Sequence, residues 1–152
     1  MKVKTYIFIS FVVMILLNSC RTIFPSAQVN FISGSEQTIT VRAVGVGINE
    51  ENAIQNAEQK VFDVLFFRGL PESTQKTPLI GSNEIDEKEK HKEYFNKFYD
   101  NKRYKTFIMS SILTSSTRKN KKGKVVSVDV KVNLSALRGD IESFGVIRKF
   151  GY

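Results

Sequence analysis

The densest positive charge in the sequence lies between residues 118 and 124, which contain five basic side chains and no acidic one. The five are Arg118, Lys119, Lys121, Lys122 and Lys124. Basic side chains gathered in one place attract polyanions, so we predict an anion-binding surface here. Its ligands would be phosphorylated lipid headgroups, acidic glycan or an acidic protein. The alternative is a solvated turn whose lysines only protect the end of a hairpin.

Other residue types with chemical potential are poorly placed for catalysis. Gly45 and Gly47 before a helix suggest a phosphate loop, but Glu50 and Glu51 would put two carboxylates where the phosphate must lie. His91 is the only histidine, and catalysis or metal binding needs partners that the surrounding lysines and glutamates do not supply. A weak cation site on that acidic run is the alternative. The sequence therefore predicts no enzyme, no metal or other cofactor, and no small-molecule substrate.

The first nineteen residues have the pattern of an export signal. Lys2 and Lys4 precede an apolar run of twelve residues at positions 6–17, which is long enough for a signal peptide and too short for a comfortable membrane span. The run ends in the sequence LNSC at residues 17–20, which resembles the lipobox of bacterial lipoproteins. The resemblance implies that residues 1–19 are a signal peptide and that Cys20 is lipidated.

Lipidation of Cys20 would anchor the protein, because several acyl chains together hold a polypeptide firmly on a bilayer. We expect a protein of the bacterial cell envelope, on the outer membrane and facing the periplasm. Export also removes nucleic acid from the partners of the basic cluster. Cys20 is the only cysteine, so no intramolecular disulfide can form. The alternatives for this residue are a buried free thiol and an uncleaved N-terminal anchor.

Cleavage before Cys20 leaves 152 − 19 = 133 residues, which suits one small domain with its own core. We assign residues 20–36 to the lipidated N-terminus and a tether, because proline, serine and glycine interrupt any periodicity there. A short strand at residues 28–32 is the alternative. Residues 37–147 are predicted to form the domain, and residues 148–152 a basic C-terminal tail.

Residues 38–69 predict a strand, a glycine turn and a helix. β-Branched residues recur along the strand, and the glycines within residues 45–47 mark either a bulge or the close approach of another backbone. Asn49 is the predicted N-cap of the helix, and Gly69 its predicted end. The apolar face of the helix carries two alanines, whose small side chains let a helix pack closely on a sheet.

The middle of the chain predicts a loop and then a charged helix. Residues 70–83 are rich in proline, glycine and polar side chains, and Leu79 and Ile80 are the apolar residues that would attach this loop to the core. Residues 84–99 predict one charge-dense helix with a solvated face. Aromatic residues near its end are expected to face the core.

The last third predicts a hairpin and a short helix. Residues 107–113 are apolar on both faces, which favours a central strand, and residues 126–134 alternate as a half-buried strand. The turn between them is expected at residues 120–123. Ser135 is the predicted N-cap of a final helix that ends at Gly145. The order strand-helix-helix-strand-strand-helix predicts an α+β fold, with a small mixed or antiparallel sheet and helices packed on one face.

The sequence AVGVG at residues 43–47, the helix alanines and LSALR at residues 134–138 together resemble small bacterial lipoproteins of the LPP and flagellar-assembly FlgT type. The resemblance covers residues 38–69 and 104–147, and residues 70–100 are an insertion relative to it. It implies a compact module with a structural or assembly role and no chemistry of its own. We therefore expect a membrane-anchored, non-enzymatic envelope lipoprotein that binds a protein partner. The alternative is a module whose basic hairpin binds anionic lipid headgroups or acidic glycan.

Overall fold

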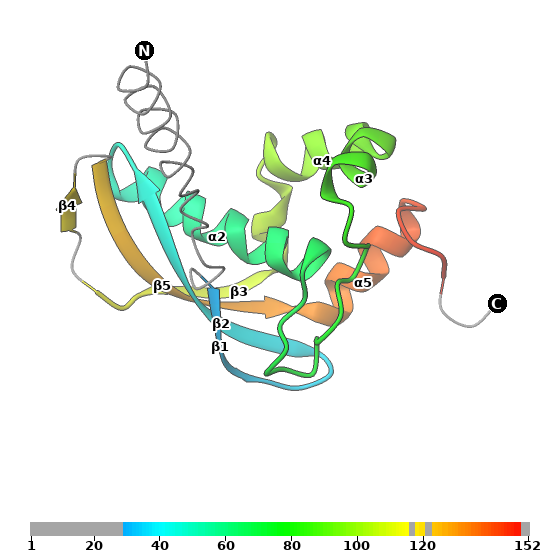
Figure 1. Cartoon of the computed structure of the whole chain (residues 1–152), viewed down its shortest axis with the longest axis horizontal. Coiled ribbons are helices and arrows are strands. Elements are labelled where there is room, and N and C mark those ends of the chain that lie inside the picture. The colour runs from blue at the N-terminus through cyan, green and yellow to red at the C-terminus, as the bar shows by residue number, and fades with distance from the viewer. Residues whose placement is uncertain (1–28, 116–117, 121–122, 150–152) are drawn as a thin grey trace, which may run out of the picture.

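The computed structural model describes residues 29–115, 118–120 and 123–149, which form an α+β fold with an antiparallel sheet, as predicted (Figure 1). The elements are β1 (Val29–Gly34), β2 (Thr38–Gly47), α2 (Glu50–Phe67), α3 (Glu84–Lys90), α4 (Lys92–Tyr99), the 3₁₀ helix η1 (Arg103–Phe107), β3 (Ile108–Leu113), β4 (Arg118–Asn120), β5 (Gly123–Asn133) and α5 (Leu134–Ser143). Figure 1 shows α2 lying across one face of the sheet.

β2 and β5 form the centre of the sheet, whose strand order is β1-β2-β5-β3, and β4 also pairs with β5. The β2–β5 register runs without interruption from Thr38 opposite Asn133 to Gly47 opposite Lys124. Among the described residues β3 pairs only with β5 and is an edge strand, so the prediction of a central strand at residues 107–113 is wrong. Met109, Ile112 and Leu113 are exposed at the edge, and only Ile108 packs partly against the core, so the strand is not buried on two faces.

Residues 29–34, which the sequence assigned to the tether, form the other edge strand. β1 runs antiparallel to β2, with Val29 opposite Ala43 and Gly34 opposite Ile39. Val29 is buried and belongs to the hydrophobic core. Serine and glycine have low strand propensity, so the local sequence favoured a tether. The strand forms because its residues pack against β2, which is distant from local sequence signals. The sheet therefore begins before the predicted domain boundary.

α2 and β2 approach each other closely. A Cβ atom on Gly45 would lie 1.9 Å from the carbonyl oxygen of Ala53, and a Cβ on Gly47 would lie 2.4 Å from the Ala53 nitrogen. Because the β2–β5 register is continuous, the two glycines mark a close backbone approach and not a bulge. Ala53 and Ala57 are fully buried at this contact. The small residues therefore fix the distance between the helix and the sheet.

Both predicted ends of α2 are confirmed. The Asn49 side chain accepts a hydrogen bond of 2.8 Å from an amide in the first turn, and Gly69 has a left-handed φ of 73° just beyond the helix. The following loop is attached to the helix as expected, since the amides of Leu79 and Ile80 donate to carbonyl groups in the last turn of α2.

The charged segment is two helices and not one. α3 ends and α4 begins at His91, whose φ of −115° and ψ of 35° are not helical. α3 buries no side chain, whereas α4 buries Tyr94, Phe95 and Phe98. The break lets α4 turn these rings into the core, where Phe98 packs edge-on against Phe62 of α2 at a centroid distance of 5.2 Å. The prediction of core-facing aromatic residues is therefore confirmed.

The N-cap of α5 lies two residues earlier than predicted. Asn133 is the N-cap, and its side-chain oxygen accepts from the amide of Ala136 at 3.0 Å. Ser135 lies inside the helix, and its hydroxyl contacts the Asn133 side chain at 2.9 Å. Asparagine thus performs the role assigned to serine, since both side chains cap helices equally well. The helix ends before Gly145, which has a left-handed φ of 68°.

Candidate functional site

The β1 side of the sheet has an edge that is covered by α2. β1 pairs with residues 39–43 of β2, and no described strand pairs with residues 44–47 on that side. The Val46 amide donates to the side-chain oxygen of Asn56 at 3.1 Å, and the Val44 carbonyl accepts from Lys60 Nζ at 3.0 Å. Side chains of α2 therefore take the place of a strand here, which is one way proteins block unwanted strand pairing.

The β3 side of the sheet is different. Met109, Ile112 and Leu113 are 54%, 60% and 41% exposed, and the strand contains no charged residue. Seven large apolar side chains are exposed in the described part of the chain, and these three occupy one six-residue strand. An uncharged apolar edge is a template for pairing with another chain.

The backbone of β3 presents hydrogen-bonding groups to this open side. The Thr114 amide donates to the Ser127 carbonyl of β5 at 2.9 Å. Inward-facing and outward-facing residues alternate along an antiparallel pair, so the N–H and C=O groups of Ser111 and Leu113 point away from β5. Among the described residues, no segment lies on their far side. β3 is therefore ready to accept an extended strand.

Positive charge flanks this neutral strand in the sequence. η1 and the residue before it contribute Lys102, Arg103 and Lys105, and β4 contributes Arg118 and Lys119. Arg103 already contacts Asp140, and Lys105 Nζ lies 3.7 Å from a Glu58 carboxylate oxygen. In the sequence, an apolar and uncharged strand therefore lies between two basic segments.

Beneath this side of the domain lie two buried polar atoms that lack a hydrogen-bond partner among the described residues. Glu58 Oε2 and the Tyr104 hydroxyl are buried and make no hydrogen bond to any described residue. Burial, together with the nearby Glu58 carboxylate, raises the pKa of Tyr104 to about 12. At the β2 edge, in contrast, the outward-facing Val46 amide and Val44 carbonyl both have a hydrogen-bond partner.

The predicted anion-binding cluster lies at the tip of the β4–β5 hairpin. Asn120 is opposite Gly123 and Lys119 is opposite Lys124, which is the register expected of a turn at residues 120–123. Lys124 is partly exposed. The turn residues Lys121 and Lys122, and the side chains of Arg118 and Lys119, lie outside the described part of the structure. Anion binding at this tip stays a prediction.

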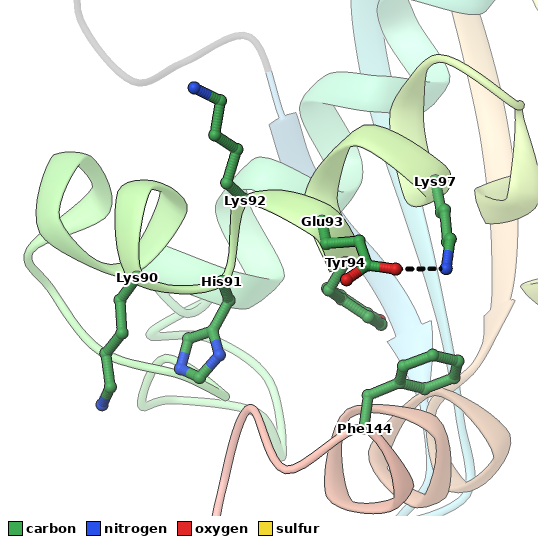
Figure 2. Close-up of a pocket in the computed structure, with 7 residues that line it drawn as sticks. All are labelled: Lys90, His91, Lys92, Glu93, Tyr94, Lys97 and Phe144. Atoms are coloured by element: carbon green, nitrogen blue, oxygen red, sulfur yellow. Dashed lines mark hydrogen bonds and ion pairs between the residues drawn. The ribbon is translucent and has the colours of Figure 1, made fainter.

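A cavity of about 260 Å³ lies where α4 begins, against the end of α5 (Figure 2). It is lined by Lys90, His91, Lys92, Glu93, Tyr94, Lys97 and Phe144. Figure 2 shows Lys90 and Lys92 pointing in opposite directions, and Lys97 is bound to Glu93 at 2.6 Å. The cations therefore do not converge on one ligand position.

The wall of this cavity is a structural contact. The Tyr94 hydroxyl donates to Asp140 at 2.9 Å, which joins α4 to α5. Burial, and then the Asp140 carboxylate, raise the pKa of Tyr94. His91 Nε2 is 3.6 Å from a Glu87 oxygen, too far for a hydrogen bond. These residues hold two helices together and form no constellation for proton transfer.

The described residues contain neither a metal-binding cluster nor a membrane-spanning helix. No three His, Cys, Asp or Glu side chains among them lie close enough together to hold a metal ion. Of the helices that the structure describes, none has the length and apolar character needed to span a bilayer. Cys20, the predicted lipidation site, precedes the described residues.

No family model matches this chain, and no curated protein or solved structure matches it either. The sequence analysis did not identify the β3 edge as a site, although it noted that residues 107–113 are apolar on both faces. Apolar residues on both faces of a strand indicate either burial in the centre of a sheet or exposure at an edge, and only the strand order distinguishes the two.

Proposed function

We propose that this protein is a lipid-anchored, non-enzymatic module of the bacterial cell envelope that binds a protein partner by strand addition. The observation that carries the proposal is β3, an uncharged edge strand with three exposed apolar side chains and outward-facing backbone groups. In strand addition, main-chain hydrogen bonds supply affinity and alternate side chains supply specificity. The lipobox-like sequence that ends at Cys20 supports the membrane anchor.

The partner segment that fits this edge is extended, apolar in its centre and acidic at its ends. Its centre would pair with Ser111 and Leu113 and cover Ile112. Its carboxylates would lie near the basic residues of η1 and β4. Complementary charge of this kind speeds association and fixes the register of a complex.

A second copy of this chain fits less well. In an antiparallel pairing of two β3 strands, β4 of each copy would lie beside η1 of the other. Both segments are basic, since β4 contains Arg118 and Lys119 and η1 contains Arg103 and Lys105. Like charges that face each other disfavour that pairing.

The anchor is tested by growing cells with radioactive palmitate. We expect label on the protein, and no label on Cys20→Ala. Absence of incorporation, or incorporation that survives Cys20→Ala, contradicts the anchor.

The binding edge is tested by placing a photo-crosslinking amino acid at position 112 in intact cells. Position 32 is the matched control, because Ile32 is an exposed isoleucine on the opposite edge, 43% exposed against 60% for Ile112. We expect one discrete protein adduct from position 112, and lower yield when Ser111 is changed to proline. Equal adducts from both positions contradict the proposal, and an adduct with the mass of two copies replaces the acidic partner by a second copy.

A further inference from the structure

Lys131 lies on β5 beside the open edge strand β3. It is opposite Ser110 of β3 on one side and opposite Thr40 of β2 on the other, so neither cross-strand neighbour carries a charge. Lys131 is partly exposed, and it has no hydrogen-bond or ion-pair partner among the described residues. An unpaired cation therefore lies next to an edge that has room for another strand, which we call the guest strand.

A charged pair on the same face of the sheet is already complete. Asp129 accepts hydrogen bonds from Arg42 Nε at 2.7 Å and from a second guanidinium nitrogen at 2.8 Å. Asp129 is opposite Ile112 of β3, which is 60% exposed. A guest side chain beside Ile112 would meet an apolar surface, whereas one beside Ser110 would meet the unpaired ammonium group of Lys131.

The register of β3 against β5 fixes the face on which each guest side chain would lie. Leu113 is opposite Val128, which belongs to the core, so Leu113 lies on the face of the sheet that α2 covers (Figure 1). Ser111 shares this face, and Ser110 and Ile112 lie on the other one, because successive side chains of a strand alternate between faces. Residues directly opposite each other in neighbouring strands share a face, so each of these positions has one guest neighbour.

The regular part of the β3 edge is short. The β3–β5 register shifts between Ile108 and Ser110, which is the mark of a bulge. Regular pairing then continues as far as the Thr114 amide, which donates to a β5 carbonyl at 2.9 Å. β4 pairs with β5 in a different register, so the regular edge ends before β4. A guest strand can therefore pair regularly only along residues 110–114.

We propose that the partner binds β3 as an antiparallel strand with an acidic residue beside Ser110, whose carboxylate pairs with Lys131. The proposal rests on strand addition as the proposed function and adds the order of the partner's side chains. Every described strand pair in this sheet is antiparallel, and an antiparallel guest continues that pattern. From its N-terminus, the guest then has two apolar residues, one small residue and the acid, beside residues 113, 112, 111 and 110 in turn.

The distance between Lys131 and the guest is within reach of two side chains. Neighbouring strands lie about 4.8 Å apart, so the two backbones would be about 10 Å apart with β3 between them. Lysine has a flexible four-carbon stem that can cross this gap from one side, and a glutamate or aspartate covers the rest from the other. Ser110 has a short side chain and leaves this path open, whereas Ile112 would block the same path two residues further along β3.

The experiment uses the full chain in detergent and two fluorescent peptides with uncharged ends. One peptide has the centre Val-Val-Thr-Glu, and the other has lysine in place of glutamate. We expect the native protein to bind the glutamate peptide about fivefold more tightly than the lysine peptide, as an exposed ion pair allows. Lys131→Gln should remove this preference, and Lys131→Glu should reverse it. Lys124→Glu is the matched control, because it makes the same change of charge on the same strand opposite Gly47, far from Ser110.

Each outcome decides a separate part of the proposal. If neither peptide binds saturably, or Ser111→Pro weakens neither, strand addition at β3 fails and this proposal fails with it. If Ser111→Pro weakens both peptides but Lys131→Gln leaves their ratio unchanged, strand addition stands and the role of Lys131 is wrong. A ratio that Lys124→Glu changes as much as Lys131→Glu does reflects net charge alone and overturns the specific pairing. Tighter binding of the reversed centre, Glu-Thr-Val-Val, overturns the antiparallel direction.

Discussion

Two stretches of strand backbone, residues 44–47 of β2 and the outer side of the edge strand β3, meet the same physical problem in different ways. Each edge exposes backbone groups that another strand could pair with. On the β2 side, Asn56 and Lys60 of α2 bind the outward-facing groups of Val46 and Val44. On the β3 side, Met109, Ile112 and Leu113 are exposed, and the described residues provide no cover.

The difference shows which edge is protected and which is open for use. On the β2 side, side chains of α2 already form the hydrogen bonds that another strand would form. The close contact between α2 and Gly45 holds the helix in this position. An uncharged apolar edge risks aggregation unless a partner covers it. We infer that the protected edge belongs to the scaffold and that the open edge belongs to the function.

The largest expected loss of stability comes from a substitution that moves α2 away from β2. Gly45→Ala places a Cβ 1.9 Å from the Ala53 carbonyl oxygen, so α2 must move away from β2. Overpacking of this kind costs about 3 kcal/mol or more, and it also moves Asn56 and Lys60 off the edge. The measurement is the free energy of unfolding in urea. Gly81→Ala is the control, because its Cβ would meet no atom within 4 Å, and equal losses in the two variants would refute the close approach.

A smaller loss of stability is expected when a substitution exposes the backbone of the β2 edge directly. Asn56→Ala leaves the Val46 amide without its partner. An unpaired, partly buried amide costs about 1–2 kcal/mol, and the opened edge should increase self-association at high concentration. Gln55→Ala is the control, since Gln55 binds only the exposed side chain of Glu51. A variant as stable and as monomeric as the control would show that α2 does not protect this edge.

The smallest expected change in the free energy of unfolding at neutral pH comes from replacing Tyr104 on the β3 side. The Tyr104 hydroxyl is buried without a partner, so Tyr104→Phe should change the free energy of unfolding by less than about 1 kcal/mol. The folded protein raises the pKa of this hydroxyl from 10.0 to about 12, so the neutral form stabilises the fold below pH 10 and this contribution is lost as the pH rises toward 12.

The phenylalanine variant should therefore lose less stability than the native protein between pH 10.0 and about 12. Some alkaline loss will stay, because burial and the Asp63 carboxylate also raise the pKa of Tyr99. Urea unfolding across this pH range gives the comparison. Identical pH profiles for the two proteins would contradict the burial of the Tyr104 hydroxyl.

Local features of the fold were predictable from the sequence, and long-range ones were not. Asn49 and Gly69 bound α2 because capping depends on a few adjacent residues. The hairpin register at residues 120–123 also follows from local turn chemistry. A strand near β1 was given only as the alternative to a tether, because its burial depends on β2. The break at His91 was missed because it arises when α4 packs on α2.

The candidate site shows the same limit. Composition alone identified the basic residues around Lys124, because clustered charge is visible in a linear sequence. The exposed edge at Ile112 required the strand order, which sets whether an apolar strand is central or peripheral. The position of Lys131 beside Ser110 likewise follows only from the strand register.

The most direct test of the account is a binding titration at the β3 edge. The probe is a fluorescent peptide with a Val-Thr-Val-Ser-Val centre and aspartates at both ends, and the control peptide carries lysines in their place. Ser111→Pro removes an outward N–H, whereas Ser111→Ala retains it. We predict saturable binding of the acidic peptide, weakened about tenfold by the lysine ends or by Ser111→Pro and unchanged by Ser111→Ala. Equal binding of the two peptides, or equal binding by the two variants, would contradict strand addition at β3.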